Sequence, residues 1–361
     1  MHLQVLDWWI IAAFFVVSLF IGLSFARSSS KSTSQFFLGD RKMPWWLLGV
    51  SMVATTFSAD TPNLVTDIVR KGGVAGNWAW WAFLLTGMLT VFVYAKLWRR
   101  SGITTDLEFY ELRYSGKPAQ FLRGFRAIYL GFIFNVLIMA TVMLAGIKIS
   151  GIMLGLSPVV TVTIVSVITV IYASIGGFKG VIYTDFFQFG IAMIGMIIGC
   201  IYIVNLPEIG GLTSLLTNPA VQPRLNFVPD FSDKNLVVSL LVIPLAVQWW
   251  SVWYPGAEPG GGGYIAQRML SAKDEKNAIS ATLLFNIAHY ALRPWPWILI
   301  ALASLIMYPS LSDIANTFTG IDKNIVNDDL AFPAMLSHLP SGILGLIVAA
   351  LIAALMSTIS T

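Results

Sequence analysis

Residues 51–62 read SMVATTFSADTP, and this stretch decides how the chain is organised. It lies inside an apolar segment, residues 44–69, that is long enough to enter a lipid bilayer. Hydroxyl, acidic and helix-breaking residues crowd its middle: Thr55, Thr56, Ser58, Asp60, Thr61 and Pro62. Backbone in hydrocarbon must satisfy its own hydrogen bonds, and a proline removes one donor and clashes with the preceding turn. We therefore predict a broken membrane helix, buried in protein or lining a wet cavity, whose freed carbonyls and hydroxyls hold a cation and a solute.

The composition indicates an all-α polytopic membrane protein. Of the 361 residues, 57% are hydrophobic and 11% are charged, whereas soluble domains carry about 25% charged residues. The basic residues lie in short loops between apolar runs, so we predict a lipid bilayer as the surroundings and no nucleic-acid partner. No obligatory protein partner is predicted. The single cysteine, Cys200, excludes an intrachain disulfide and is interpreted as a packed core residue.

Apolar runs of about 20 residues predict the membrane spans. Nine segments are predicted by that rule: residues 6–26, 44–69, 76–95, 127–147, 158–175, 181–204, 236–254, 277–307 and 342–361. The second is the broken one. The first is as long as a span and is not followed by a small-residue cleavage site, so we predict no cleavable signal peptide.

The distribution of Lys and Arg predicts the orientation, because cytoplasmic loops are enriched in these residues. With the N-terminus outside, most of the 22 basic residues fall in cytoplasmic loops: Arg27, Lys31, Arg41, Lys42, Lys96, Arg99, Arg100, Arg113, Lys117, Arg123, Arg126, Lys179, Arg268, Lys273 and Lys276. The outer side holds fewer: Arg70, Lys71, Lys148, Arg224, Lys234 and Lys323. We therefore predict an odd number of spans in the cytoplasmic (inner or plasma) membrane.

Two long polar loops, residues 205–235 and 308–340, are predicted on the outer side. The second carries several acids: Asp313, Asp322, Asp328 and Asp329. These acids could draw cations to the outer mouth, but a solvated loop face is the favoured interpretation. Residues 342–361 are still apolar where the chain ends, so we expect it to be a fragment of a longer polypeptide that does not transport by itself.

A second informative stretch, residues 172–188, reads YASIGGFKGVIYTDFFQ. The glycine pair ends one apolar span, Lys179 marks a cytoplasmic turn, and Asp185 lies inside the next span. An acid in a membrane span is costly and needs a partner or water. It could equally be a structural acid stabilised by the positive end of a helix dipole.

This stretch resembles the signature of the sodium:solute symporter family. The matching positions are Tyr172, Gly176, Gly177, Gly180, Thr184, Asp185 and Gln188. Two further motifs agree in order and spacing. Residues 36–41, FFLGDR, followed by PWW, look like the start of the family's first core helix, and residues 264–268, YIAQR, look like its cytoplasmic turn. The resemblance covers the whole chain.

The resemblance implies a LeuT-like fold, which is an inverted repeat of five plus five helices preceded by one extra helix. Residues 1–43 would then be the extra N-terminal helix and linker of a single membrane domain. Residues 44–204 would form the first repeat, and residues 236–361 would begin an incomplete second repeat. The family's function, sodium-coupled symport of a small organic solute by alternating access, is expected with it, and no enzymatic activity is expected.

The family places sodium between the broken core helix and the eighth core helix. The ligands carried over are the carbonyls of Ala54, Phe57 and Ala354 and the hydroxyls of Ser357 and Thr358. Hard cations take about six oxygen ligands, and freed carbonyls with hydroxyls supply them. The alternative is that both hydroxyls bond back to their own helix.

Some family members hold a second sodium at the signature aspartate. Here Asp185, Ser357, Ser360 and Thr361 match that pattern. Ser357 and Ser360 are three residues apart and share a helix face. This match would give Asp185 a partner and a stoichiometry of two sodium ions, with Na+ as the coupling ion.

The resemblance also implies solute contacts. Thr56, Ser58, Asp60 and Thr61 fall where family members contact substrate on the broken helix. Trp80 and Phe83 fall where the family's sugar carriers present polar side chains, which argues against a sugar-type site.

Residues 249–263 read WWSVWYPGAEPGGGG. The prolines and glycines between residues 255 and 263 make a regular helix unfavourable there. We predict an unwound, solute-facing segment in which Glu258 is an acid near substrate; a flexible cytoplasmic loop is the alternative. Arg293 lies within a predicted span. It could pair with Glu258, meet an anionic solute, or be a structural charge.

Two other functions compete with symport. A membrane enzyme would need a nucleophile with its base or a metal cluster, and the sequence contains none of the HExxH, GxSxG or GxxxxGK[ST] motifs. A non-transporting sensor or channel could keep the symporter fold. Sodium-dependent flux would separate symport from this alternative.

Overall fold

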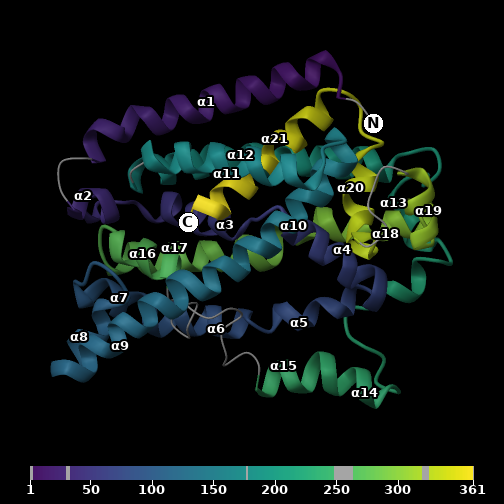
Figure 1. Ribbon diagram of the computed structural model, residues 1–361. Helices are drawn as coiled ribbons and strands as arrows, with labels where there is room; N and C mark the ends of the chain where they lie inside the picture. The colour runs from purple at the N-terminus through teal and green to yellow at the C-terminus, as the bar shows by residue number, and fades with distance from the viewer. Residues whose placement is uncertain (1–2, 30–32, 176–177, 248–262, 319–324, 361) are drawn as a thin grey trace.

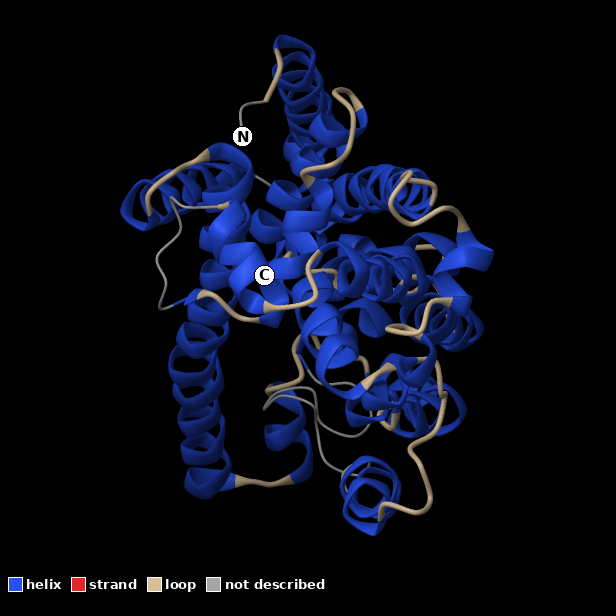
Figure 2. Cartoon of the chain, turned by 90° about the vertical axis from the view of Figure 1, so that its right-hand side faces the viewer, coloured by secondary structure: helices blue, strands red, loops and turns tan. Residues whose placement is uncertain are grey.

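The computed structural model describes residues 3–29, 33–175, 178–247, 263–318 and 325–360. These residues form helices and no β-strand, apart from an isolated bridge between Met43 and Ala272. Most of the long helices run along one common direction, with α1 (Val5–Ser29) at one edge of the bundle (Figure 1). Several are seen nearly end-on after a quarter turn (Figure 2). The all-α prediction is confirmed for the residues described.

The other α-helices follow in chain order: α2 (Thr33–Leu38), α3 (Trp45–Thr56), α4 (Asp60–Gly72), α5 (Trp78–Trp81), α6 (Leu84–Leu89), α7 (Ala95–Ser101), α8 (Glu108–Arg113), α9 (Gly116–Ile128), α10 (Asn135–Leu154), α11 (Pro158–Ile175), α12 (Phe178–Val204), α13 (Leu212–Thr217), α14 (Lys234–Val237), α15 (Ile243–Ala246), α16 (Gly263–Ser271), α17 (Glu275–Asn286), α18 (Pro294–Met307), α19 (Leu311–Thr317), α20 (Ala331–Leu336) and α21 (Ile343–Ser360). The π-helical turns η3 (Thr90–Tyr94), η4 (Tyr129–Phe134), η6 (Val238–Val242) and η8 (Ile287–Leu292) join neighbouring helices.

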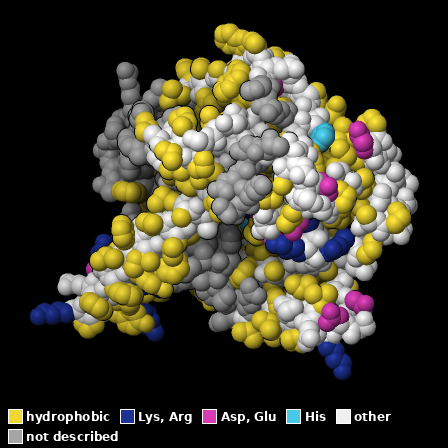
Figure 3. Space-filling model, turned by 45° about the vertical axis from the view of Figure 1, so that its right-hand side comes forward, with side chains coloured by type: hydrophobic (Ala, Val, Ile, Leu, Met, Phe, Trp, Pro, Cys, Tyr) yellow, Lys and Arg dark blue, Asp and Glu magenta, His cyan; other side chains and the backbone are white. Residues whose placement is uncertain are grey.

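Four helical segments are long and apolar enough to cross a membrane: Val5–Gly22, Gly116–Leu154, Phe178–Val204 and Glu275–Met307. They correspond to the first, fourth, sixth and eighth predicted spans. The second predicted span is divided into α3 and α4, as expected. The fifth, seventh and ninth appear as shorter apolar helices within the described residues. On the face in Figure 3, hydrophobic side chains cover much of the surface.

Two predicted spans differ in shape from the expectation. The third is not one straight helix, because the segments Val74–Trp81 and Leu84–Ser101 are bent by 40° where they meet. The fourth, predicted at residues 127–147, belongs to a continuous helical segment, Gly116–Leu154. Its N-terminal extension carries Lys117, Arg123 and Arg126, so the charge pattern that predicted a loop there is compatible with helix.

Close helix contacts hold the centre of the bundle. The helix α3 packs against α12 and α17, and α21 packs against α1, α10 and α12. Gly49 brings α3 close to α17, because a Cβ there would lie 2.9 Å from the carbonyl oxygen of Ala281. Gly199 of α12 likewise meets Ile347 of α21. Small residues that let helices approach closely are typical of membrane bundles, where dispersion contacts drive association.

A buried acid joins α1 to α21. Asp7, 1% exposed, accepts hydrogen bonds from the backbone N–H groups of Gly342 at 2.7 Å and Gly345 at 3.0 Å. The first N–H groups of a helix have no partner within it and carry partial positive charge, so a carboxylate from a neighbouring helix satisfies both needs. Asp7 therefore fixes the N-terminal end of α21 against α1.

At one end of the bundle the start of α3 is bonded to the turn before α17. The Met43 N–H donates to the Ser271 carbonyl at 3.3 Å, and the Lys273 N–H donates to the Met43 carbonyl at 3.0 Å. Arg100 donates two hydrogen bonds of 3.0 Å to Glu275. The start of α3, the end of α7 and the start of α17, whose flanking basic residues were predicted to be cytoplasmic, thus lie together at one end of the bundle, at the left of Figure 1.

The YIAQR motif corrects one prediction. Residues 264–268 were expected to form a cytoplasmic turn, but they belong to α16. Arg268, which was counted among the loop cations, is 2% exposed. A charge count along the sequence does not reveal the depth at which a side chain lies, because a long basic side chain can reach a buried carboxylate.

At the opposite end two adjacent acids hold buried cations. Asp328 accepts from Arg70 Nε at 2.7 Å, and Asp329 pairs with Lys148 Nζ at 2.5 Å. The favoured interpretation of this loop as a solvated face is therefore wrong for these two acids. This loop, which was predicted to be on the outer side, instead connects α4 to α10 through neighbouring carboxylates.

We expect Gly345→Ala to destabilise the protein by about 1–3 kcal/mol, the usual effect of overpacking. A Cβ at this position would lie 2.6 Å from Asp7 Cα, so α1 and α21 must separate. The measurement is the thermal unfolding midpoint in detergent. Gly190→Ala is the matched control, because its Cβ would meet nothing within 4 Å. Equal midpoints for the two variants would contradict the close contact.

We expect Asp328→Asn to lower the free energy of unfolding by roughly 2 kcal/mol, because it leaves the guanidinium of Arg70 buried without a counter-charge. Glu111→Gln is the control. It breaks a pair with Arg123 whose side chains are 40% and 43% exposed, so a change below about 1 kcal/mol is expected. A larger effect of the control in chemical unfolding would show that burial does not decide these contributions.

Candidate functional site

The break in the second span lies between Thr56, where α3 ends, and Asp60, where α4 begins. Phe57 adopts an extended conformation with φ −85° and ψ 96°. Pro62 lies in the first turn of α4, where a missing N–H costs nothing because that group has no helical partner. The hydroxyl of Ser58 is buried without a hydrogen-bond partner. The predicted break is therefore present, and polar groups at its centre are unsatisfied.

A small crevice of about 10 Å³ lies on one side of the break, between α3, α12 and α21. It brings together three of the predicted sodium ligands, Ala54, Phe57 and Ala354, and the signature acid Asp185. The Ala54 carbonyl accepts the N–H of Phe57 at 3.0 Å, and the Ala354 carbonyl accepts the Thr358 hydroxyl at 3.0 Å. The Ala354 carbonyl also lies within α21, so a cation there would have to take the place of the Thr358 hydroxyl.

The hydroxyl-bearing end of α21 is described in part. Thr358 bonds back to its own helix, as the structural alternative predicted, and also lines the larger cavity on the other side of the break. The side chains of Ser357 and Ser360, and the whole of Thr361, lie outside the described residues. Their predicted roles in sodium binding remain predictions.

The buried carboxylate of Asp185 has partners that the sequence did not suggest. Its Oδ2 accepts from Ser51 Oγ at 2.8 Å and lies 3.6 Å from Arg268 Nη2. Arg268 also donates to Thr55 Oγ1 at 2.8 Å. Asp185, Arg268 and the two hydroxyls thus form one cluster that joins α12, α16 and α3. The cluster borders the crevice, because Asp185 also lines it. The predicted partners of Asp185 were the hydroxyls of α21, so the ion pair with Arg268 is an addition to that expectation.

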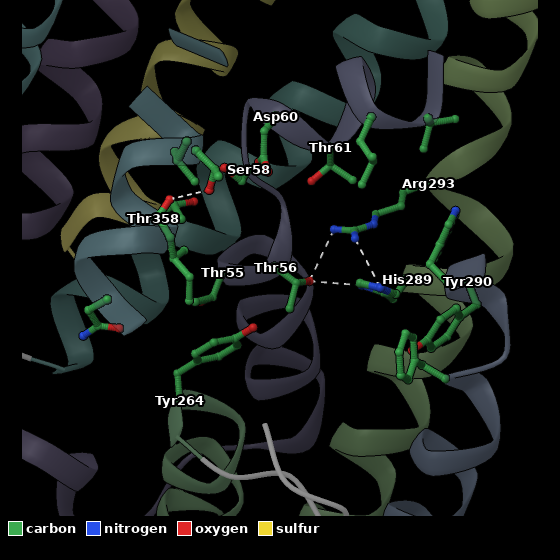
Figure 4. Close-up of a pocket in the computed structure, with 18 residues that line it drawn as sticks. Thr55, Thr56, Ser58, Asp60, Thr61, Tyr264, His289, Tyr290, Arg293 and Thr358 are labelled. Atoms are coloured by element: carbon green, nitrogen blue, oxygen red, sulfur yellow. Dashed lines mark hydrogen bonds between the residues drawn. The ribbon is translucent and has the colours of Figure 1, made fainter. Parts of the chain in front are cut away.

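On the other side of the break lies a larger cavity of about 290 Å³ (Figure 4). The predicted solute contacts Thr56, Ser58, Asp60, Thr61, Trp80, Phe83 and Arg293 all line it. It is also lined by Thr55, Leu64, Val65, Asn135, Ile138, Thr141, Val142, Tyr264, His289, Tyr290 and Thr358. Glu258 lies outside the described residues. The lining thus includes residues of α3 and α4, on the two sides of the break, and residues of α10, α16 and η8.

Three polar side chains form a buried cluster in this cavity. Thr56 Oγ1 lies 3.1 Å from His289 Nδ1 and accepts from Arg293 Nη1 at 3.3 Å. Arg293 Nη2 lies 3.3 Å from His289 Nε2. Because a guanidinium has only donors, Nε2 must be the acceptor, which places the imidazole proton on Nδ1, facing Thr56 (Figure 4). The histidine is therefore neutral and holds the arginine in place.

Aromatic rings form the neighbouring wall. Trp80 stacks on Tyr290 with centroids 5.8 Å apart, and His289 meets Tyr290 edge-on at 4.5 Å. Sequence analysis missed Tyr264, His289 and Tyr290. The available signal was the Pro294 and Pro296 pair, which follows the π-helical turn η8, where the Arg293 N–H bonds to Ala288 five residues back. Such turns are frequent at functional sites.

The groups around the helix break are carbonyls, hydroxyls, the guanidinium of Arg293 and aromatic rings. Within the described residues no group of three or more His, Cys, Asp or Glu side chains is placed to hold a metal ion. Oxygen and guanidinium groups beside a broken membrane helix are the kind of groups that bind ions and polar solutes in transporters.

The sequence model of the sodium:solute symporter family matches residues 36–361. The chain belongs to the sodium:solute symporter family. The chain is 27% identical to sodium-coupled monocarboxylate transporter 2 of Mus musculus and 26% identical to sodium/glucose cotransporter 1 of Oryctolagus cuniculus, each over 98% of this chain and 55% of the relative. The chain thus spans about half the length of these relatives.

A solved structure shares the fold. It is reported as the substrate-bound outward-open state of a Na+-coupled sialic acid symporter, and it matches 99% of this chain and 71% of that chain with a TM-score of 0.76. At 21% sequence identity the likeness establishes the arrangement of helices and nothing about the solute. The family's transporter fold is confirmed, while the division into inverted repeats stays a prediction.

A double-mutant cycle tests the ion pair beneath the crevice. Asp185→Asn alone removes the carboxylate charge that faces the buried guanidinium of Arg268, and we expect it to cost about 3 kcal/mol. Combining it with Arg268→Gln removes both charges, so part of that loss should return. The measurement is the unfolding midpoint of each variant in detergent. Additive losses would mean that the two charges do not stabilise each other.

Proposed function

We propose that the protein moves a small organic solute across the cytoplasmic membrane together with Na+, which descends its gradient. One observation carries the proposal: the crevice and the larger cavity lie on two sides of the same helix break. Ala54 and Phe57 line the crevice, whereas Thr55, Thr56, Ser58, Asp60 and Thr61 line the cavity. An ion in the crevice would therefore order the same backbone that lines the solute cavity, and each ligand would favour the binding of the other.

The proposed sodium ligands are the carbonyls of Ala54, Phe57 and Ala354 with the hydroxyls of Ser357 and Thr358. Three of these residues line one crevice, and Thr358 already contacts the Ala354 carbonyl. A cation would compete for that hydroxyl, whose lone pairs are free to turn toward it. Sodium is bound by neutral oxygen ligands, so these carbonyls and hydroxyls can hold it without a carboxylate.

A second sodium at Asp185, Ser360 and Thr361 is proposed with a specific condition. The Asp185 carboxylate is within 3.6 Å of Arg268, and this cation would repel a sodium ion. Occupation of a second site therefore requires the Arg268 side chain to move away. The proposal links second-ion binding to a rearrangement of α16 against α12.

The larger cavity is the proposed solute site. Its polar groups converge from the break and from η8, while Trp80 and Phe83 give it an apolar wall. Pockets of this kind, mostly apolar with a few placed polar groups, are typical of small-molecule sites. The relatives are named for monocarboxylates and for sugars, so both classes are candidates. Alternating access would expose this cavity to each side of the membrane in turn, with the N-terminus of the chain outside.

The test is solute uptake into proteoliposomes made from the protein of the complete reading frame. We expect an inward sodium gradient to drive uptake of at least one solute from a panel of sugars, amino acids and monocarboxylates. Potassium or choline should not replace sodium. Thr358→Ala should raise the sodium concentration for half-maximal uptake about tenfold, because it removes one of a few oxygen ligands.

Thr217→Ala is the control, because its hydroxyl makes the same bond to a carbonyl four residues back, at 2.9 Å, in an exposed helix. Uptake that is independent of sodium, or a Thr358→Ala response equal to the control, would refute sodium symport through this site. Binding without any flux would favour the sensor alternative.

A further inference from the structure

Arg293 is exceptional among the buried basic side chains. The described residues contain four such side chains, each at most 7% exposed: Arg70, Lys148, Arg268 and Arg293. The first three have carboxylate partners, Asp328, Asp329 and Asp185 respectively. Arg293, which is 1% exposed, has no carboxylate within 4 Å among the described residues.

Among the described residues, the side chains that contact Arg293 directly are neutral. It donates to the Thr56 hydroxyl and to the unprotonated Nε2 of His289, and its guanidinium lies 5.4 Å from the Trp297 ring. Its Nε has no hydrogen-bond partner. A buried cation held only by neutral groups has a large unmet electrostatic cost, which an anion in the adjoining cavity would offset.

Asp60 offsets only part of this cost, because its carboxylate attracts Arg293 from a distance and forms no ion pair with it within 4 Å. It lines the same cavity, but it lies in the first turn of α4, where the helix N-terminus stabilises its charge. One of its oxygens, Oδ1, is buried without a hydrogen-bond partner and can accept from a donor. The cavity thus presents one fixed cation and, in another part of its wall, one acceptor.

We infer that the transported solute is a small organic monocarboxylate whose carboxylate binds Arg293. The planar guanidinium binds carboxylates in a two-pronged geometry, and Thr56 and His289 already fix its orientation. The stacked pair Trp80 and Tyr290 offers an apolar face for the body of the solute. Asp60 disfavours a second negative charge and favours a hydroxyl or amino donor on the solute. The inference rests on the proposed function only in that it calls the ligand a transported solute.

The experiment compares carboxylates with their neutral amides. Acetate, L-lactate, pyruvate and nicotinate, each beside its amide, are titrated into the purified protein in nanodiscs while the unfolding midpoint is followed, with and without sodium. We expect at least one carboxylate to raise the midpoint and its amide to have no effect. Arg293→Gln should weaken that binding by at least about tenfold, and Arg293→Lys should restore part of it. Arg123→Gln, at an exposed pair, is the control.

The wild-type comparison does not depend on whether a variant folds. The inference is overturned if no carboxylate binds better than its amide, or if Arg293→Gln binds as the wild type does. Uptake separates this outcome from failure of the proposed function. Sodium-driven uptake of neutral solutes alone would keep symport and reject the carboxylate. Carboxylate binding that depends on Arg293 but shows no sodium dependence or flux would keep this inference and reject symport.

Discussion

The constraint behind this structure is that backbone groups within hydrocarbon need partners. A helix supplies its own, and a break at residues 57–59 removes them. The protein surrounds the break with α12, α18 and α21, so that Phe57 stacks on Trp297 at 5.7 Å, and hydroxyls and carbonyls face two enclosed spaces instead of lipid. The crevice and the larger cavity thus both adjoin the same interruption of the helix.

Buried charges are paired at two places in the bundle. Asp185 and Arg268 neutralise each other beneath the break, and Arg70 and Lys148 are neutralised by Asp328 and Asp329 at the far end. In both places a buried charge joins helices that are distant in sequence. Arg293 differs from these, because no carboxylate among the described residues lies within 4 Å of it. This difference is the basis for proposing that it meets a carboxylate of the solute.

Much of this could be predicted from the sequence. The crowding of Thr55, Thr56, Ser58 and Asp60 in an apolar run is incompatible with a lipid-facing helix, so the break and the lining of the cavity followed from local chemistry. The partner of Asp185 did not, because Arg268 lies in a motif whose basic residue looked like a loop charge. His289 and Tyr290 were missed since an aromatic run on a helix resembles ordinary packing. Burial and long-range pairing depend on three-dimensional arrangement, which residue types alone do not give.

The backbone bridge at Met43 has a mechanical consequence. Because Met43 is bonded to both Ser271 and Lys273, the N-terminal ends of α3 and α17 are held together, and Gly49 lets the two helices pack closely further along. In the alternating-access cycle proposed above, the two helices would therefore move as one unit past α12. The extended backbone at Phe57 would absorb the bend, while α4 stays tied to Asp328 through Arg70.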